Sequence, residues 1–359
     1  MSEVRRQSRS KPQRADHYPS IVDLFAGAGG LSLGMQMALP SAHITLLEKD
    51  PDCIRTLKLN FPGADVIQAD VRDVNFRKLH PTILVAGPPC QGFSKLNRNR
   101  LDDPRNDLAR EAVRAAGVTR PQFVIVENVP GFLASPSAEH LVGDLSGLGF
   151  VVRSGIVNCA DYGVPQIRKR ALVIAARLGL PIPWPEATHS GKRVDARQPW
   201  RTVADAFAML PTIPDGANWH RPYSPRAVSD PRYRAIPQGG ARRDLPPDLQ
   251  LRCWQQTRGY SDVLGRLVWD RPATTVRTAF FRPEKGRFLH PVADRPITVR
   301  EAARLQSFPD TFDFPESTSL ESVGRQVGNA VPALVARAIG KSIARLVVDF
   351  PRPLSEVAV

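Results

Sequence analysis

The sequence predicts an α/β fold: a wound, mostly parallel sheet of seven strands, joined to a smaller, loop-rich basic lobe. From Ile21 onward, short apolar runs that end in Gly, Pro or an acidic residue alternate with amphipathic stretches, which is typical of a parallel sheet with covering helices. From residue 181 to about residue 270 the sequence is rich in Pro and Arg and has few periodic apolar runs, as expected of loops. Helical patterning returns at residues 298–306 and 331–347, so we expect the end of the chain to pack back onto the first core.

The strands and one helix start can be located from local patterns. The apolar runs predicted as strands are residues 21–25, 43–48, 66–70, 83–86, 123–127, 151–157 and 172–176. Thr298 can cap the helix at 298–306, because Glu301 follows three residues later. Ligands bind outside the carboxyl ends of strands in open α/β sheets. Since the informative residues fall at those ends, we expect a single active-site crevice there.

Length and composition exclude several classes of protein. The chain has 359 residues, 42% apolar and 23% charged, which is enough to bury a full core. Its four cysteines show no CxxC spacing, so neither a disulfide framework nor a structural zinc site is predicted. No apolar run approaches the ~18 residues needed to cross a bilayer, and the first twenty residues lack the apolar stretch of a signal peptide. We therefore expect a soluble protein of the cytoplasm.

The positive charge is concentrated in two segments. The formal net charge is +14; residues 190–290 hold 18 Lys and Arg against 9 Asp and Glu, and residues 1–20 hold 5 against 2. Such an excess either covers a solvated surface or forms a footprint for the phosphate backbone of a nucleic acid. The second interpretation predicts an acidic polymer as partner.

A glycine-rich loop follows the first predicted strand and opens a helix. It spans residues 23–31, Asp-Leu-Phe-Ala-Gly-Ala-Gly-Gly-Leu, and its glycines let a ligand approach the turning backbone closely. Ser32 stands where a dinucleotide loop has its third glycine, which weakens that interpretation. Glu48 and Asp70, at the ends of the next two strands, are placed to accept hydrogen bonds from ribose hydroxyls and an adenine amino group.

These acids favour a cationic cofactor. A dinucleotide would bring a pyrophosphate to the start of the helix, whereas S-adenosylmethionine carries a sulfonium cation and no phosphate. Phe25 could lie against that cation, because cations are attracted to an aromatic face. For the glycine loop taken alone, a plain tight turn remains the alternative.

A cysteine follows the fourth predicted strand, within residues 87–94, Gly-Pro-Pro-Cys-Gln-Gly-Phe-Ser. The prolines stiffen the turn, so the thiol of Cys90 would be held out at the edge of the sheet. Glu127 ends the neighbouring strand and brings a carboxyl group to the same crevice. A lone cysteine is more often an inert buried thiol, but a position at a strand end beside an acid favours a nucleophile.

These motifs together resemble those of the DNA (cytosine-5)-methyltransferase family of prokaryotic type. The glycine loop, the Pro-Pro-Cys segment, Glu127-Asn128-Val129, residues 166–170 (Gln-Ile-Arg-Lys-Arg) and residues 326–332 (Gln-Val-Gly-Asn-Ala-Val-Pro) occur in the family's order over nearly all of residues 20–345. Residues 271–276 and 290–306 resemble the segment after its target-recognition region. The resemblance implies the sheet of the S-adenosylmethionine-dependent methyltransferases, S-adenosylmethionine as methyl donor, no metal, and double-stranded DNA as substrate.

The resemblance also implies a covalent route. Carbon 5 of cytosine is not nucleophilic enough to accept a methyl group unaided, so a thiolate first adds to carbon 6. Cys90 would be that thiolate, favoured by helix dipoles, nearby Arg or contact with the base. Glu127, with a raised pKa, would hydrogen-bond ring nitrogen 3. Arg168 and Arg170, alternate residues on a predicted strand, would point to the same side and contact the base oxygen and nearby backbone, with two surface arginines as the alternative.

The expected cofactor contacts lie in the glycine loop, at the following strand ends, beside the Pro-Pro-Cys segment and at the start of the last helix. They are Phe25, Gly27, Ala28, Gly29, Gly30, Leu31, Glu48, Lys49, Asp70, Val71, Pro89, Leu108, Asn329 and Val331. Asn329 and Val331 would open the last helix and close over the cofactor, and Asn329 could also cap that helix.

The basic lobe is expected to serve the DNA. A cytosine in a duplex must be flipped out before its ring can react, at a cost of a few kcal/mol. Arginine-rich loops could offset this cost through phosphate and base contacts. Trp219, Trp254 and Tyr260 are interleaved with these arginines, although a role in the core of the lobe is the simpler interpretation for them.

The resemblance divides the chain as follows. We expect residues 1–19 to be a disordered basic tail, 20–185 the catalytic and cofactor-binding core, 186–320 a small lobe with a target-recognition region at about 190–270, 321–348 a C-terminal helix returning to the core, and 349–359 a second tail. A monomer at the nucleoid is expected, serving alone or beside a restriction endonuclease.

Three other functions would account for part of this pattern. A transfer-RNA cytosine methyltransferase would share the core chemistry, but the sizeable basic lobe suits duplex DNA. A non-catalytic DNA-binding protein is disfavoured because Cys90, Glu127 and Arg168 are all present. A nicotinamide oxidoreductase is disfavoured by the missing third glycine and by the Pro-Pro-Cys segment.

Overall fold

The structure is a computed structural model that describes residues 18–89, 108–192, 196–223, 229–255 and 262–349. The strands are β1 Ser20–Asp23, β2 His43–Glu48, β3 Asp65–Gln68, β4 Ile83–Ala86, β5 Phe123–Asn128, β6 Phe150–Asn158, β7 Lys169–Arg177, β8 His189–Ser190, β9 Gln198–Pro199, β10 Gly265–Arg266 and β11 Arg287–Leu289. The α-helices are α1 Gly30–Ala38, α2 Pro51–Asn60, α3 Arg110–Thr119, α4 Pro136–Gly147, α5 Val203–Phe207, α6 Asp230–Ala235, α7 Arg252–Gln255, α8 Val299–Leu305, α9 Leu320–Asn329 and α10 Ala333–Asp349.

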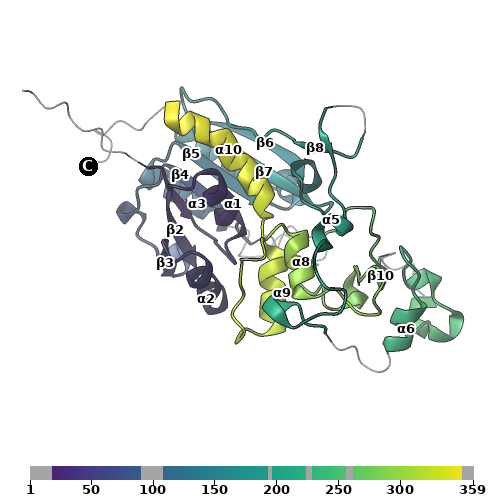
Figure 1. The fold of residues 1–359 in the computed structure, drawn as a ribbon. Coiled ribbons are helices and arrows are strands. Elements are labelled where there is room, and N and C mark those ends of the chain that lie inside the picture. The colour runs from purple at the N-terminus through teal and green to yellow at the C-terminus, as the bar shows by residue number, and fades with distance from the viewer. Residues whose placement is uncertain (1–17, 90–107, 193–195, 224–228, 256–261, 350–359) are drawn as a thin grey trace, which may run out of the picture.

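The main sheet has seven strands in the order β3-β2-β1-β4-β5-β7-β6 (Figure 1). Strands β1 to β5 pair in parallel, with Ile21 of β1 opposite Ile44 of β2 and Ile83 of β4. Strand β7 runs antiparallel to both of its neighbours, β5 and β6. The predicted wound, mostly parallel seven-stranded sheet is therefore confirmed, and each predicted strand lies within a few residues of an observed one.

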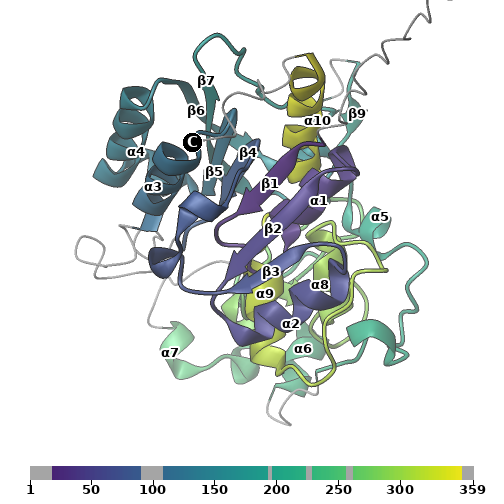
Figure 2. The same cartoon turned by 90° about the vertical axis from the view of Figure 1, so that its left-hand side faces the viewer.

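Each face of the sheet is covered by helices, as Figure 2 shows edge-on. Alternate residues of the central strands face opposite sides because successive side chains of a strand alternate. Ile83 and Val85 of β4 join a core with α1, α2 and α10, whereas Leu84 and Ala86 join a second core with α3 and α4. Burial on both sides explains why these strands are continuously apolar.

The chain returns to the sheet through two helices rather than one. Sequence patterning placed the start of the last helix at Asn329, but α9 ends at that residue and α10 begins at Ala333. Helix α10 packs closely along α1 (Figure 1). A Cβ atom on Gly34 of α1 would lie 2.2 Å from the carbonyl oxygen of Ala333, so only glycine allows this approach.

A smaller lobe lies beyond the carboxyl ends of the parallel strands. Its own apolar cluster includes Tyr233, Leu245 and Leu264, and Trp254 packs against it. Trp219 instead belongs to the main core, is 3% exposed and donates a hydrogen bond of 2.8 Å to the carbonyl oxygen of Phe314. Both tryptophans thus have packing roles.

The capping box of α8 is confirmed, because Thr298 and Glu301 each accept a hydrogen bond from the other's backbone N–H. Cys90, Tyr260, residues 1–17 and residues 350–359 lie outside the described residues.

Candidate active site

A cavity of about 410 Å³ lies at the carboxyl ends of the parallel strands and collects most of the predicted site residues. Every expected cofactor contact except Gly29 lines it, and so do Glu127, Arg168 and Arg170. The residues come from the β1–α1 loop, the ends of β2, β3, β4 and β5, the start of β7 and the end of α9. Pro89, which precedes Cys90, is also in the lining.

The side chain of Asp23 stabilises the shape of the glycine loop. This buried carboxylate accepts hydrogen bonds from the backbone N–H of Phe25 (3.3 Å) and from the hydroxyl of Ser32 (2.6 Å). Burial raises the pKa of Asp23 to about 6. Gly29 has a φ of 88°, and a Cβ on it would lie 2.5 Å from the ring of Phe61. Ser32, the departure from the dinucleotide pattern, therefore supports the loop rather than a phosphate.

Glu48 is fixed by the backbone on both of its oxygens. Its Oε2 accepts a hydrogen bond of 2.8 Å from the N–H of Gly27, and Oε1 accepts bonds of 2.8 and 2.9 Å from the N–H groups of Lys49 and Asp50. Three donors hold the carboxylate at the edge of the cavity. An ionised carboxylate has about four acceptor sites, so one site remains, on Oε2, and it is suited to a hydroxyl donor.

Asp70 has a partner that the sequence pattern did not reveal. Arg72 binds it through both carboxylate oxygens, at 2.9 and 2.7 Å, and the backbone N–H of Arg72 donates to it at 3.1 Å. These hydrogen bonds hold the pKa of Asp70 well below its usual range. Asp70 stays ionised and keeps only part of its acceptor capacity for an amino group.

Glu127 and Arg170 form an ion pair inside the cavity. Arg170 Nε lies 2.8 Å from Glu127 Oε1, and their side chains are 13% and 9% exposed. The pair spans the neighbouring strands β5 and β7. Burial raises the pKa of Glu127 despite the opposing effect of Arg170 and Arg168. The raised pKa agrees with the direction that the sequence predicted for a carboxyl group acting on a ring nitrogen.

The loop that leads to Cys90 begins directly beside this pair. Ala86 of β4 pairs with Val126 of β5, so Gly87 and Glu127 are neighbours at the ends of their strands. The Asn128 side chain donates a hydrogen bond of 3.3 Å to the carbonyl oxygen of Pro88. Asn128 thus ties the start of the loop to the strand that carries Glu127.

Arg168 lines the same cavity as Arg170 and contacts the protein backbone. Its guanidinium donates to the carbonyl oxygens of Val276 (2.9 Å), Gly328 (2.9 Å) and Ala330 (3.2 Å). Arg168 precedes β7 and is only 2% exposed. The positively charged guanidinium therefore lies at the cavity wall, where it donates hydrogen bonds to backbone carbonyl oxygens.

Some lining residues were missed by sequence patterns. Asp50 and Cys53 come from the start of α2, and Arg325 and Gln326 come from α9. Gln326 belongs to a recognised motif and lies within the C-terminal helix expected over residues 321–348, but the end of α9 at Asn329 was not predicted.

The described residues hold neither a cluster of metal ligands nor a membrane-spanning helix. In this part of the chain, no group of three or more His, Cys, Asp or Glu side chains is arranged to hold a metal ion. Among the same residues, no helix is long and apolar enough to cross a membrane.

Sheet topology and cavity together define an S-adenosylmethionine-dependent methyltransferase. A structure of a putative DNA modification methyltransferase encoded within an E. coli prophage superposes with a TM-score of 0.69 at 28% identity, over 92% of this chain and 99% of that one. The Dnmt2 methyltransferase of S. pombe superposes with a TM-score of 0.64 over 93% of this chain and 99% of that one; at 15% identity this supports the fold alone.

Sequence comparison identifies the family. The model of the C-5 cytosine-specific DNA methylases matches residues 20–345. The chain is 34% identical to the Type II methyltransferase M1.HphI of Haemophilus parahaemolyticus, over 91% of this chain and 87% of that protein, and 33% identical to the Type II methylase M.HgiDII of Herpetosiphon aurantiacus, over 91% and 95%. The chain therefore belongs to the C-5 cytosine-specific DNA methylase family. It is a DNA (cytosine-5)-methyltransferase with S-adenosylmethionine as methyl donor.

Proposed function

We propose that the cavity holds S-adenosylmethionine beside a flipped-out cytosine and that Cys90 is the nucleophile. The observation that carries this proposal is the buried Glu127–Arg170 pair, which lies where the Pro88-Pro89 loop leaves β4. A base that enters beside this pair would share the cavity with the glycine loop and with Pro88 and Pro89, which precede Cys90 in the sequence. The expected cofactor contacts, apart from Gly29, line the same space.

The lining suits the methyl donor chemically. Glu48, fixed by three backbone N–H groups, would accept a hydrogen bond from a ribose hydroxyl, and ionised Asp70 would accept one from the adenine amino group. Phe25 would lie against the cofactor, and Asn329 and Val331 would cover it from the end of α9. When bound, the cofactor supplies a methyl group attached to a positively charged sulfur, which is attracted to aromatic faces.

The base would be activated by the residues on β5 and β7. Glu127, whose pKa is raised by burial, can hold a proton at ring nitrogen 3 as negative charge develops on the base. Arg170 orients this carboxyl group and can donate to the base oxygen. Cys90 would add to carbon 6, so that carbon 5 can take the methyl group; loss of the carbon 5 proton then allows the thiolate to leave. None of these steps calls for a metal ion.

The biological setting follows from the family and the relatives. Double-stranded DNA is the proposed partner of the basic small lobe, and a bacterial cytoplasm, at the nucleoid, is the proposed location. We propose a monomer that serves a Type II restriction–modification system, because M1.HphI and M.HgiDII are Type II enzymes. A cognate endonuclease would then act in the same restriction–modification system without binding to this protein.

Bisulfite sequencing of DNA from cells that express the protein tests this function. We expect protected cytosines in one short sequence context, with none in cells that express Cys90→Ala. A matched bisulfite analysis of transfer RNA from the same cells tests the alternative substrate. Protection only in transfer RNA, or in neither nucleic acid, would overturn the proposal.

A further inference from the structure

The joint between α9 and α10, residues 330–332, forms one wall of the cavity. Asn329, Ala330 and Val331 line the cavity here, and a Cβ on Gly30 of α1 would lie 2.4 Å from the carbonyl oxygen of Val331. A helix leaves its last four carbonyl groups without partners inside the helix. Helix α9 ends without a left-handed residue, since Ala330 has φ −55° and ψ 142°. Its terminal carbonyls must therefore find donors elsewhere.

Two buried side chains supply those donors. Arg168 donates to the carbonyl oxygens of Gly328 (2.9 Å) and Ala330 (3.2 Å). Gln306 Nε2 donates to the carbonyl oxygens of Val327 (2.6 Å) and Ala330 (3.3 Å). Arg168 is 2% exposed and Gln306 0%. The position of the joint thus depends on these two residues.

Gln306 is itself oriented by a second buried amide, Gln166. Gln166 Nε2 donates to Gln306 Oε1 (2.9 Å) and to the carbonyl oxygen of Leu305 (3.0 Å), while Gln166 Oε1 accepts from the N–H of Val276 (2.8 Å). This series begins at a backbone N–H and ends at backbone carbonyls. Turning either amide over would place donor against donor or acceptor against acceptor, so a single arrangement is favoured.

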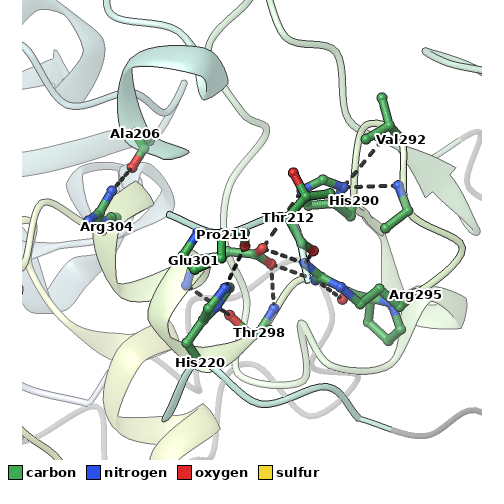
Figure 3. Close-up of polar contacts among 12 residues, drawn as sticks. Ala206, Pro211, Thr212, His220, His290, Val292, Arg295, Thr298, Glu301 and Arg304 are labelled. Carbon is green, nitrogen blue, oxygen red and sulfur yellow. Dashed lines mark hydrogen bonds and ion pairs between the residues drawn. The ribbon is translucent and has the colours of Figure 1, made fainter. Parts of the chain in front are cut away.

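The helix before Gln306 is also anchored at its other end. Figure 3 shows this anchor, in which Glu301 accepts hydrogen bonds from Arg295 Nη2 (2.7 Å) and from the N–H of Thr298 (2.7 Å). His220 Nδ1 lies 3.0 Å from Thr298 Oγ1. Helix α8 is therefore fixed at both ends. Gln306, at its C-terminal end, contacts the joint that forms the cavity wall, whereas Thr298, at its N-terminal end, does not.

We propose that Gln306 is a positioning residue for the cofactor: by capping α9 it places Asn329 and Val331 against the methyl donor. This role rests on the proposed assignment of the cavity to S-adenosylmethionine. Gln306 does not line the cavity, so it acts through the joint rather than by touching the cofactor. Its loss should weaken cofactor binding and leave the DNA-binding lobe unchanged.

The test compares two variants at opposite ends of α8. Gln306→Met keeps the volume but removes both donors, whereas Thr298→Ala removes the helix cap far from the joint. S-Adenosylhomocysteine binding is measured by calorimetry, DNA binding by anisotropy, and unfolding by circular dichroism. For Gln306→Met we expect the Kd for S-adenosylhomocysteine to rise about tenfold, because carbonyls are left unpaired. Thr298→Ala should lower the unfolding temperature but keep the wild-type Kd.

A third variant separates positioning from packing. In Gln306→Glu, a protonated carboxyl group can still donate one hydrogen bond to the joint, and it loses this ability when it ionises. Its affinity for S-adenosylhomocysteine should therefore fall as pH rises from 6 to 9, relative to wild type. If Gln306→Met does not fold well, this variant and hydrogen exchange at residues 327–334 provide the same comparison.

The outcomes are distinguishable. Wild-type affinity in both folded Gln306 variants, or equal weakening in Thr298→Ala, would overturn the positioning role while leaving the proposed function intact. Failure of the wild-type protein to bind S-adenosylhomocysteine would overturn the assignment of the cavity, and the positioning role with it.

Discussion

A methyl group added at Gly30 should disturb the contact between the glycine loop and the α9–α10 joint. A Cβ at this position would lie 2.4 Å from the carbonyl oxygen of Val331 and 3.2 Å from the Cβ of Ala330. The first atom that the added methyl group meets is a backbone atom, which cannot rotate away. Arg168 and Gln306 also hold the joint in place through hydrogen bonds to the carbonyl oxygen of Ala330. The loop or the joint must therefore shift.

The size of the effect can be worked out from these contacts. Overpacking of a tight interface costs about 1–3 kcal/mol, and the helical preference of alanine over glycine returns roughly 0.5–1 kcal/mol. The difference is a net loss of at most about 2.5 kcal/mol, which should lower the unfolding temperature by up to about 3 °C in a chain of 359 residues. Because both displaced segments line the cavity, the Kd for S-adenosylhomocysteine should rise about tenfold, which corresponds to 1.4 kcal/mol.

Thermal unfolding and calorimetric titration of Gly30→Ala measure both quantities. Gly63→Ala is the matched control, since a Cβ at Gly63 meets nothing within 4 Å. If Gly30→Ala had the same unfolding temperature and the same Kd for S-adenosylhomocysteine as Gly63→Ala, the close approach of the glycine loop and the joint would be refuted.

Three further predictions concern the carboxyl groups and the basic lobe. Glu127→Gln should lower kcat by about 10²–10⁴-fold, as expected for loss of an acid–base group, with DNA affinity retained; an unchanged kcat in single-turnover assays would remove Glu127 from the chemistry. The pKa of Asp23 is raised from 3.8 to about 6, so the folded state holds the proton more tightly than the unfolded state and the free energy of unfolding should fall as pH rises from about 4 to 6, by at most about 3 kcal/mol. Urea unfolding of Asp23→Asn should show a weaker pH dependence over that interval, and an identical dependence in both proteins would contradict it. The affinity for DNA should fall by about 10³-fold or more between about 50 and 200 mM salt if six or more phosphates are contacted; a flat response in anisotropy titrations would exclude a phosphate footprint.

The sheet was predictable from sequence because its strands are buried on both faces. Runs such as Ile83–Ala86 are wholly apolar, and the residues that follow them fall at one edge of the sheet. This is also why the residues expected to contact the cofactor, although spread from Phe25 to Val331, could be predicted from the sequence to lie in one crevice.

The packing partners of helix α9 could not be predicted, although the helix lies almost wholly within the C-terminal helix expected over residues 321–348. A Cβ on Gly324 would lie 2.6 Å from the carbonyl oxygen of Thr278, and one on Gly328 would lie 2.5 Å from the backbone of Arg277. These glycines allow the helix to pack against residues 277–281, a contact between distant segments that local patterns do not reveal.

The carbonyl partners of Arg168 could not be predicted for a related reason. Alternation along a strand predicts that Arg168 and Arg170 share a side, but Arg168 lies just before β7. Its acceptors are carbonyls 108 to 162 residues further along the chain. Partners at that separation are set by the tertiary fold. Arg72 could have been found, because it follows Asp70 by two residues.

Covalent trapping tests the central claim most directly. A DNA duplex that carries 5-fluorocytosine in the recognised context cannot lose its carbon 5 substituent as a proton, so the thiolate adduct persists after methyl transfer. With S-adenosylmethionine present, we predict a protein–DNA complex that survives denaturation and whose crosslinked peptide contains Cys90, and no such complex with Cys90→Ser. Absence of the adduct in the wild-type protein, or an adduct through another residue, would contradict the account.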